Sequence, residues 1–291
     1  GITMSVVNTN VSASVAQAAL ARNERALGAA MEKLSTGKKI NSAADNAAGL
    51  AISTQMTSQI RGLGVAVSNA NDAISMVNTA EGALDEITAM LQRMRELAVQ
   101  AGTGTTASND RTYLQSEFTA LRTEIDRIAD NTQWNGRNIL DGSAGASTGK
   151  STVAFGIGQD GTAAQTLSTS FGNFNNTTGK LSGLASKVIT GTTLASAITV
   201  AAATVAEIDV VIGDVSSQRA TFGAVSNRLT HAVDNLTNVR TNSEASRSRI
   251  LDTDYAAATS ELARTQIIQQ AGTAMLAQAN TMPQTVLALL Q

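Results

Sequence analysis

Apolar side chains recur at alternating steps of three and four residues along the stretch 204–250, and no proline interrupts it. A seven-residue repeat of this length keeps one side of a helix apolar and predicts that another helix packs along it. At 1.5 Å per residue the helix is about 70 Å long, which indicates an extended bundle rather than a conventional globular core. The repeat positions are Ile208, Val211, Val215, Gln218, Phe222, Val225, Leu229, Ala232, Leu236 and Val239.

The same spacing predicts a long helix at 52–98 and a shorter one at 114–128, joined by a turn at 101–107. Ser108 or Asn109 is the expected N-cap of the shorter helix, because either side chain can accept backbone N–H groups. The long helix presents Ile52, Met56, Gln59, Leu63, Ala66, Ala70, Ala73, Val77, Ala80, Leu84, Ile87, Leu91, Met94 and Ala98, and the shorter one Leu114, Phe118, Leu121, Ile125 and Ile128. The predicted fold is mainly α, a long antiparallel helical bundle.

The two ends of the chain are expected to form helices that pair with each other. Residues 1–36 carry a thin apolar stripe, 35–48 lose the periodicity, and a last helix follows a break at 251–254. That last helix is apolar over more of its circumference than one partner requires. We therefore predict a terminal coiled-coil domain, 1–44 with 255–291, that also packs on copies of itself. The predicted polymerisation residues are Val11, Val15, Leu27, Leu34, Ile268, Met275, Leu276, Met282, Val286 and Leu289.

The middle of the chain is rich in Gly, Ser and Thr, and there the helical period gives way to alternation. Val153, Phe155 and Ile157 alternate with smaller residues, which predicts a β-hairpin within about 143–180. The pattern GxGxxG at 156–161 resembles a dinucleotide-binding loop, but no helix is expected after it, so we interpret it as a strand that ends in a turn. The bundle domain is predicted at 45–186 and 204–254, with 187–203 as a short connector.

Composition narrows the possible functions. Aromatic residues make up 3% of the chain, so large side chains are too few for a conventional globular core. A net charge of −2 gives no electrostatic case for nucleic acid or an anionic membrane, and the absence of cysteine excludes thiol chemistry. The longest apolar runs fall short of a membrane span, and the start of the chain lacks the features of a cleavable signal peptide. We expect export by another route.

Candidate catalytic groups are few. His231 is the only histidine, and without a second histidine or a cysteine a metal site or catalytic triad is not expected. Asp252 and Asp254 lie at the predicted helix break, where turn formation and capping explain them. We therefore expect no enzyme activity, no metal and no cofactor.

Several longer sequence motifs stand at the two ends of the chain. At the C-terminal end they are RSRILDTDYA at 247–256, QIIQQAGTAMLAQAN at 266–280 and PQTVL at 283–287. At the N-terminal end they are VNTN at 7–10, LSTG at 34–37, INSA at 40–43, AAGLAIS at 47–53 and LQRMRELAVQ at 91–100, followed by EIDR at 124–127 and NG at 135–136. These motifs resemble those of bacterial flagellin, and the similarity covers about 1–142 and 205–291. Lys38-Lys39, Trp134 and the three residues before Met4 depart from the family pattern.

The resemblance implies a structural subunit that polymerises into the flagellar filament for swimming, in a short form without outer domains. Its implied partners are copies of itself, the flagellar export apparatus and an export chaperone, the filament cap and hook-associated proteins, and a host innate immune receptor. It implies export in an unfolded state and an extracellular location. The hook–filament junction protein is a rival within the family, and a secreted adhesin or binding module, with the middle segment as its ligand face, is a rival from another class.

By the same resemblance, Arg93, Leu97 and Glu117 match positions that the innate immune flagellin receptor recognises. In the sequence, Met76, Ala83, Met90 and Leu97 form a second apolar column beside the repeat of the 52–98 helix. Two interpretations are open. In the first, the column completes a wide core stripe. In the second, it packs against a neighbouring subunit, and the receptor would recognise the monomer rather than the filament.

Overall fold

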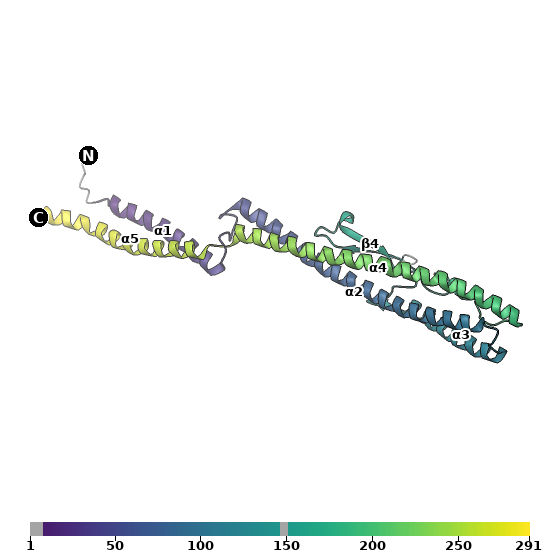
Figure 1. The fold of residues 1–291 in the computed structure, drawn as a ribbon. Helices are drawn as coiled ribbons and strands as arrows, with labels where there is room; N and C mark the ends of the chain where they lie inside the picture. The colour runs from purple at the N-terminus through teal and green to yellow at the C-terminus, as the bar shows by residue number, and fades with distance from the viewer. Residues whose placement is uncertain (1–7, 146–150) are drawn as a thin grey trace. The chain divides into compact units, whose positions relative to one another are not determined.

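The computed structural model describes residues 8–145 and 151–291, and helices dominate it (Figure 1). The predicted mainly α fold with a small β-region is confirmed. Two compact units are present: Gly1–Ser58 with Thr241–Gln291, and Gln59–Arg240. The elements are α1 (Val11–Thr36), α2 (Ala47–Ala101), α3 (Ser108–Asn131), β1 (Gln133–Trp134), β2 (Arg137–Asn138), β3 (Thr152–Gly156), η1 (Ala163–Gln165), β4 (Thr166–Ser170), η2 (Ser182–Leu184), α4 (Leu194–Leu251) and α5 (Tyr255–Leu289). Residues 1–7, which include the start of the VNTN motif, and 146–150 in the predicted hairpin region lie outside the described residues.

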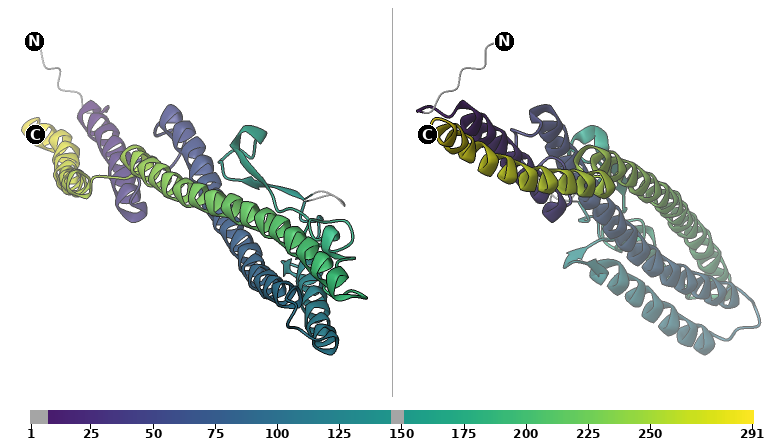
Figure 2. Two further views of the ribbon diagram at one scale, coloured as in Figure 1. Left: turned by 45° about the vertical axis from the view of Figure 1, so that its right-hand side comes forward. Right: turned by 90° about the vertical axis from the view of Figure 1, so that its left-hand side faces the viewer.

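The terminal unit is built on α1 and α5, which lie side by side in all views (Figures 1 and 2). Asn10 caps α1 by accepting the Ala13 N–H at 3.0 Å, and Gly37 ends the helix with a φ of 71°, a conformation that favours glycine. The Asp254 side chain accepts N–H groups of the first turn of α5, as predicted for a cap at this break. Both ends of the chain therefore contribute one helix each to one pair.

The second unit contains the main hydrophobic core, formed by most of α2, by α3, by most of α4 and by the segment between α3 and α4. The predicted repeat of α4 is buried at Ile208, Val211, Val215, Phe222, Val225, Leu229 and Leu236, and that of α2 from Leu63 to Ala98. The predicted repeats are wrong at one end each. Ile52, the first position of the α2 repeat, and Val239, the last position of the α4 repeat, are exposed. In the first turns of α2, Ser53 and Ile60 are buried instead. The heptad pattern thus identifies the core side of each helix but not where burial begins.

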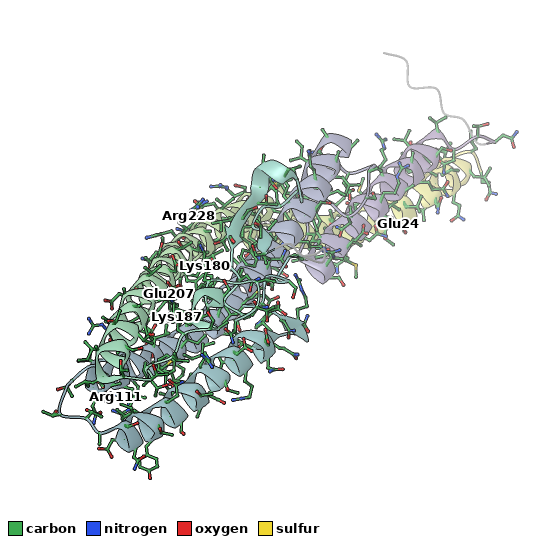
Figure 3. The ribbon with its side chains drawn as sticks, turned by 90° about the vertical axis from the view of Figure 1, so that its right-hand side faces the viewer. Glu24, Arg111, Lys180, Lys187, Glu207 and Arg228 are labelled. Atoms are coloured by element: carbon green, nitrogen blue, oxygen red, sulfur yellow. The ribbon has the colours of Figure 1, made fainter. Side chains whose placement is uncertain are left out.

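The turn between α2 and α3 lies where the sequence predicts it, but another residue stabilises it. Ala107 occupies the N-cap of α3 without a side-chain hydrogen bond, so the prediction of Ser108 or Asn109 as the cap is wrong. Arg111, which is buried, donates from Nε to the Ala101 carbonyl and from Nη2 to the Thr103 carbonyl, each at 2.9 Å (Figure 3). This guanidinium satisfies carbonyl groups at the end of α2 and fixes the reversal of the chain.

The β-region is small and packs on the helices. Strands β3 and β4 pair antiparallel, with Phe155 opposite Leu167, which confirms the predicted hairpin. Phe171 follows β4 and packs against Phe222 of α4, with ring centroids 5.0 Å apart. Only a single 3₁₀ turn, η1, follows the GxGxxG pattern, so the interpretation as a strand and turn is also confirmed.

The predicted connector at 187–203 is non-helical only in its first part, because α4 already begins at Leu194 and buries Ala197 and Ala201. Arg122 of α3 holds the non-helical part by donating to the Leu184 and Lys187 carbonyls at 3.2 and 2.9 Å. The segment lies against the bundle rather than leading to a further domain within the described residues.

One 18-residue window of α4 has a mean hydropathy of 1.8, so by length and composition α4 could span a membrane. The prediction that all apolar runs fall short of a span is therefore wrong on this criterion. The core helix of a folded bundle meets the same criterion, and α4 buries Ile208, Val211 and Val215 in the core.

Candidate assembly and recognition surfaces

The surface where α1 meets α5 combines small or polar side chains, most of them buried, with leucines and a valine that are only half-buried. Two sets of positions, spaced alternately by three and four residues, are buried or half-buried on the facing sides, and we call them together the α1–α5 seam. The seam consists of Ala13, Ala16, Leu20, Asn23, Leu27, Ala30 and Leu34 on α1, and of Ala258, Leu262, Thr265, Gln269, Gly272, Leu276, Ala279, Pro283 and Val286 on α5. Small side chains allow close approach but bury little apolar area, so the pair is held weakly by burial alone.

The ten predicted polymerisation residues divide between two faces. Leu27 and Leu34 of α1 and Leu276 and Val286 of α5 are half-buried members of the seam. The other six point away from it and are exposed, namely Val11, Val15, Ile268, Met275, Met282 and Leu289. We call these six the outward column. Met275 keeps 65% and Leu289 82% of its surface exposed, so this apolar surface has no partner among the described residues of the subunit.

The outward face of α5 is also free of charge along most of its length. Its charged side chains, Glu261 and Arg264, lie near its start and pair with each other, with an Nη2–Oε1 distance of 2.5 Å. The hydrogen bond from Arg264 lowers the pKa of Glu261, so the carboxylate stays ionised at neutral pH. An exposed, uncharged apolar helix face is unfavourable in water and typical of an interaction surface.

The predicted recognition residues lie in the second unit, where α2 and α3 are adjacent. Arg93 donates from Nε to Glu117 Oε1 at 2.8 Å and from Nη1 to Glu96 Oε2 at 3.2 Å. The hydrogen bonds from Arg93 to Glu117 and then to Glu96 raise the pKa of the guanidinium. About half of the Arg93 and Glu117 side-chain surface is exposed, so both are accessible from outside.

Leu97 differs from the other two because its side chain is fully buried. Met76 is buried as well, while Ala83 and Met90 are half-buried and pack on the same core. Of the two interpretations left open for the second apolar column, this burial favours the wide core stripe within the unit.

The remaining candidate groups fit structural roles. His231 is exposed on α4. Asp252 accepts a hydrogen bond from Ser248 Oγ at 2.5 Å, while Asp254 caps α5. Among the described residues no group of three or more His, Cys, Asp or Glu side chains could hold a metal. The sequence interpretation missed Arg111 and the seam residue Asn23, although a lone asparagine at a repeat position of an apolar stripe was a visible signal.

Paired terminal helices with an exposed, uncharged apolar column, joined to a helical bundle, are the architecture of a structural protein that assembles with copies of itself. The chain belongs to the bacterial flagellin family. The model of the bacterial flagellin N-terminal helical region matches residues 7–145, and that of the C-terminal helical region matches residues 205–290. It is accordingly a structural subunit of the flagellar filament, the organelle of swimming, in a short form of 291 residues.

Curated relatives agree along nearly the whole chain. Flagellin of Halalkalibacterium halodurans is 42% identical, with 98% of this chain and 100% of the relative covered. Flagellin A of Vibrio cholerae serotype O1 is 36% identical, with 98% and 99% covered. These relatives favour the filament subunit over the junction protein and the adhesin.

Two solved structures are also similar. Bacillus cereus flagellin shares 30% identity over 58% of this chain and 88% of that chain, with a TM-score of 0.47. A Vibrio parahaemolyticus structure, named as a flagellar hook-associated protein, shares 13% identity over 72% of this chain and all of that chain, with a TM-score of 0.57. At that identity the likeness concerns the fold alone.

Proposed function

We propose that the outward column drives polymerisation by packing on α1 and α5 of neighbouring subunits. The single observation that supports this is the exposure of an apolar, uncharged column on α5 that the seam leaves uncovered. Contacts of this kind are individually small, but a helical lattice repeats them with several neighbours, so assembly is cooperative. The terminal coiled coil, 1–44 with 255–291, then forms the inside of the tube, and the bundle, 45–186 with 204–254, forms its wall.

The test separates the outward column from the seam. Met275→Asp places a carboxylate at an exposed position of the column, where it leaves the fold of the subunit intact but would be buried without a partner in a lattice. Tyr113→Asp is the matched control, because Tyr113 is similarly exposed on α3, outside the proposed surface. We expect Met275→Asp to prevent filament formation, as seen by electron microscopy and sedimentation, and Tyr113→Asp to permit it. Normal filaments of Met275→Asp would contradict the proposal.

The same surface sets requirements before assembly. The apolar outward column is exposed to water until a lattice covers it. This supports passage of the subunit through the flagellar export apparatus in an unfolded state, and binding by an export chaperone before assembly. The cap and the hook-associated proteins then meet the same terminal helices at the two ends of the filament. The proposed location is extracellular and the proposed role is structural, without catalysis.

A second proposed function is recognition of the monomer by the host innate immune flagellin receptor. The observation that favours it is that Arg93 and Glu117 present one polar surface across α2 and α3, with both side chains accessible. Arginine is frequent among residues that dominate binding energy at interfaces. Leu97, whose side chain is fully buried in the core, is not expected to contact the receptor.

A further inference from the structure

The α1–α5 seam holds one polar contact between side chains that the surrounding apolar positions do not require. Asn23 is buried, and its Nδ2 donates to the Thr265 carbonyl at 2.8 Å and to Gln269 Oε1 at 3.2 Å. Thr265 is itself fully buried, and its hydroxyl donates back into α5. A buried asparagine in a helical pair weakens the pair but can select one register, because only one alignment satisfies its amide.

The repeat alone does not determine the register of this pair, that is, the alignment of α1 with α5 along their length. The two helices run antiparallel, since Asn10 near the start of α1 bonds the Ala279 carbonyl late in α5, while Asn23 bonds Thr265. Seam positions repeat every seven residues on both helices, so a shift of seven residues keeps the same sides facing each other. The small seam side chains change little in buried area after such a shift, so burial alone does not select the alignment.

Side-chain shape selects the alignment only in part. Leu20 lies over Gly272, where an added Cβ would be 2.7 Å from Leu20 Cδ2. A shift in one direction would place Leu27 over Gly272 instead, so a leucine would still fill the space beside this glycine. The polar pair has no such substitute, because shifts in the two directions would place Leu262 or Leu276 opposite Asn23 and an alanine opposite Gln269.

We infer that Asn23, through Gln269 and the Thr265 carbonyl, is the positioning residue that sets the register of the α1–α5 pair. The consequence reaches assembly, because a seven-residue shift moves the outward column of α5 by about 10 Å along α1. Subunits with different registers would present different surfaces to their neighbours. This consequence rests on the proposed polymerisation surface, whereas the register itself is a property of one chain.

The chain contains no cysteine, so engineered pairs report register without background. Ala13→Cys with Ala279→Cys marks the native alignment, since these positions face each other one heptad from Leu20 and Gly272. Ala13→Cys with Val286→Cys, and Leu27→Cys with Ala258→Cys, mark seven-residue shifts in opposite directions. Each pair is oxidised in assembled filaments and, separately, in unassembled subunits with trimethylamine N-oxide, an osmolyte that favours compact states. Mixing light and heavy isotope-labelled subunits distinguishes bonds within one chain from bonds between chains.

With Asn23 present, only the native pair is expected to close within a chain. Asn23→Leu leaves Gln269 unpaired in the native register and fits Leu262 or Leu276 in the shifted ones, so the ratio of shifted to native cross-links should rise at least about tenfold. Glu24→Ala is the matched control, because Glu24 is the exposed neighbour on α1 (Figure 3), and it should keep the native pair alone.

Native cross-links alone in Asn23→Leu, in either state, would overturn the inference, and so would an equal shift in Glu24→Ala. The subunit measurement does not depend on polymerisation. A register shift without loss of filaments would therefore uphold the role of Asn23 while removing its link to the proposed assembly surface.

Discussion

Arg93 of α2 and Glu117 of α3 form a two-point ion pair, with Nε–Oε1 and Nη2–Oε2 distances of 2.8 and 3.2 Å. The pair joins two helices at the surface of the second unit. Because both side chains are about half exposed, solvent screens the pair and it contributes little to stability. Both side chains of the pair are, however, accessible to a binding partner.

Arg93→Ala should raise the monomer concentration needed for half-maximal receptor signalling by about tenfold, because interface arginines often dominate binding. The melting temperature should stay close to that of the parent protein. Arg95→Ala is the control, since Arg95 is similarly exposed and pairs with Asp209 of α4 instead. Unchanged signalling by a folded Arg93→Ala protein would remove these residues from the proposed recognition surface.

Leu97→Ala tests whether the Leu97 side chain contacts the receptor or only packs in the core of the bundle. The substitution leaves a cavity in the bundle core and should cost about 2–5 kcal/mol of the free energy of unfolding, measured by urea denaturation. Signalling by the fraction that remains folded should be close to normal, because the Leu97 side chain is not accessible. A folded protein that loses signalling without losing stability would show that Leu97 contacts the receptor after all.

Deleting residues 271–291 should abolish filaments while the second unit remains folded. The deletion removes Met275, Met282 and Leu289 of the outward column and the seam residues from Gly272 onward, but none of the core of the Gln59–Arg240 unit. Circular dichroism should show a cooperative thermal transition near that of the full chain, and electron microscopy should show no tubes. Filaments of normal form would mean that α5 is not needed for polymerisation.

Trypsin should remove both ends of the unassembled subunit and leave a resistant core of about 45–250. The seam buries mainly small side chains, so α1 and α5 open at low cost before a lattice covers them. Cleavage after Arg22 and Arg25 should therefore precede cleavage after Arg93 and Arg228, which are exposed on helices of the second unit. Mass spectrometry of early fragments gives the order, and equal rates would contradict the prediction.

Asp130→Asn should stabilise the protein at neutral pH. Burial, followed by the charges of Asp126 and Asp141, raises the pKa of Asp130 above its ordinary value of 3.8. A raised folded-state pKa favours the protonated carboxyl, so its contribution to stability is present below pH 3.8 and is lost as the pH rises. The melting temperature of Asp130→Asn should exceed that of the parent by up to about 3 °C at pH 7 and by little near pH 3.

Asp126→Asn is the control for this charge effect. The carboxylate of Asp126 accepts the Asn176 N–H at 2.8 Å, so removing its charge weakens a hydrogen bond that the fold uses. We expect no stabilisation from Asp126→Asn at pH 7. A larger increase in melting temperature from Asp126→Asn than from Asp130→Asn would show that the fold disfavours the charge of Asp126 rather than that of Asp130.

The sequence alone determined the helices, their buried sides and the pairing of the two chain ends. Heptad spacing is a local property, and Phe222, Leu91 and Phe118 are buried because their neighbours three and four residues away face the same way. Alternation likewise identified the hairpin, and the loss of periodicity identified the turns.

Only the tertiary structure decided which of several apolar stripes a helix uses and where burial stops. Leu97 and Met275 look alike in the sequence, since each belongs to a second column seven residues apart, yet one is fully buried and the other is 65% exposed. The difference arises because α3 and the segment after it cover α2, whereas α5 packs mainly on α1. The hydrogen bonds of Asn23 reach Thr265 and Gln269 at the other end of the chain, and those of Arg111 reach back across the turn to Ala101 and Thr103. Apolar periodicity carries no information about such polar contacts.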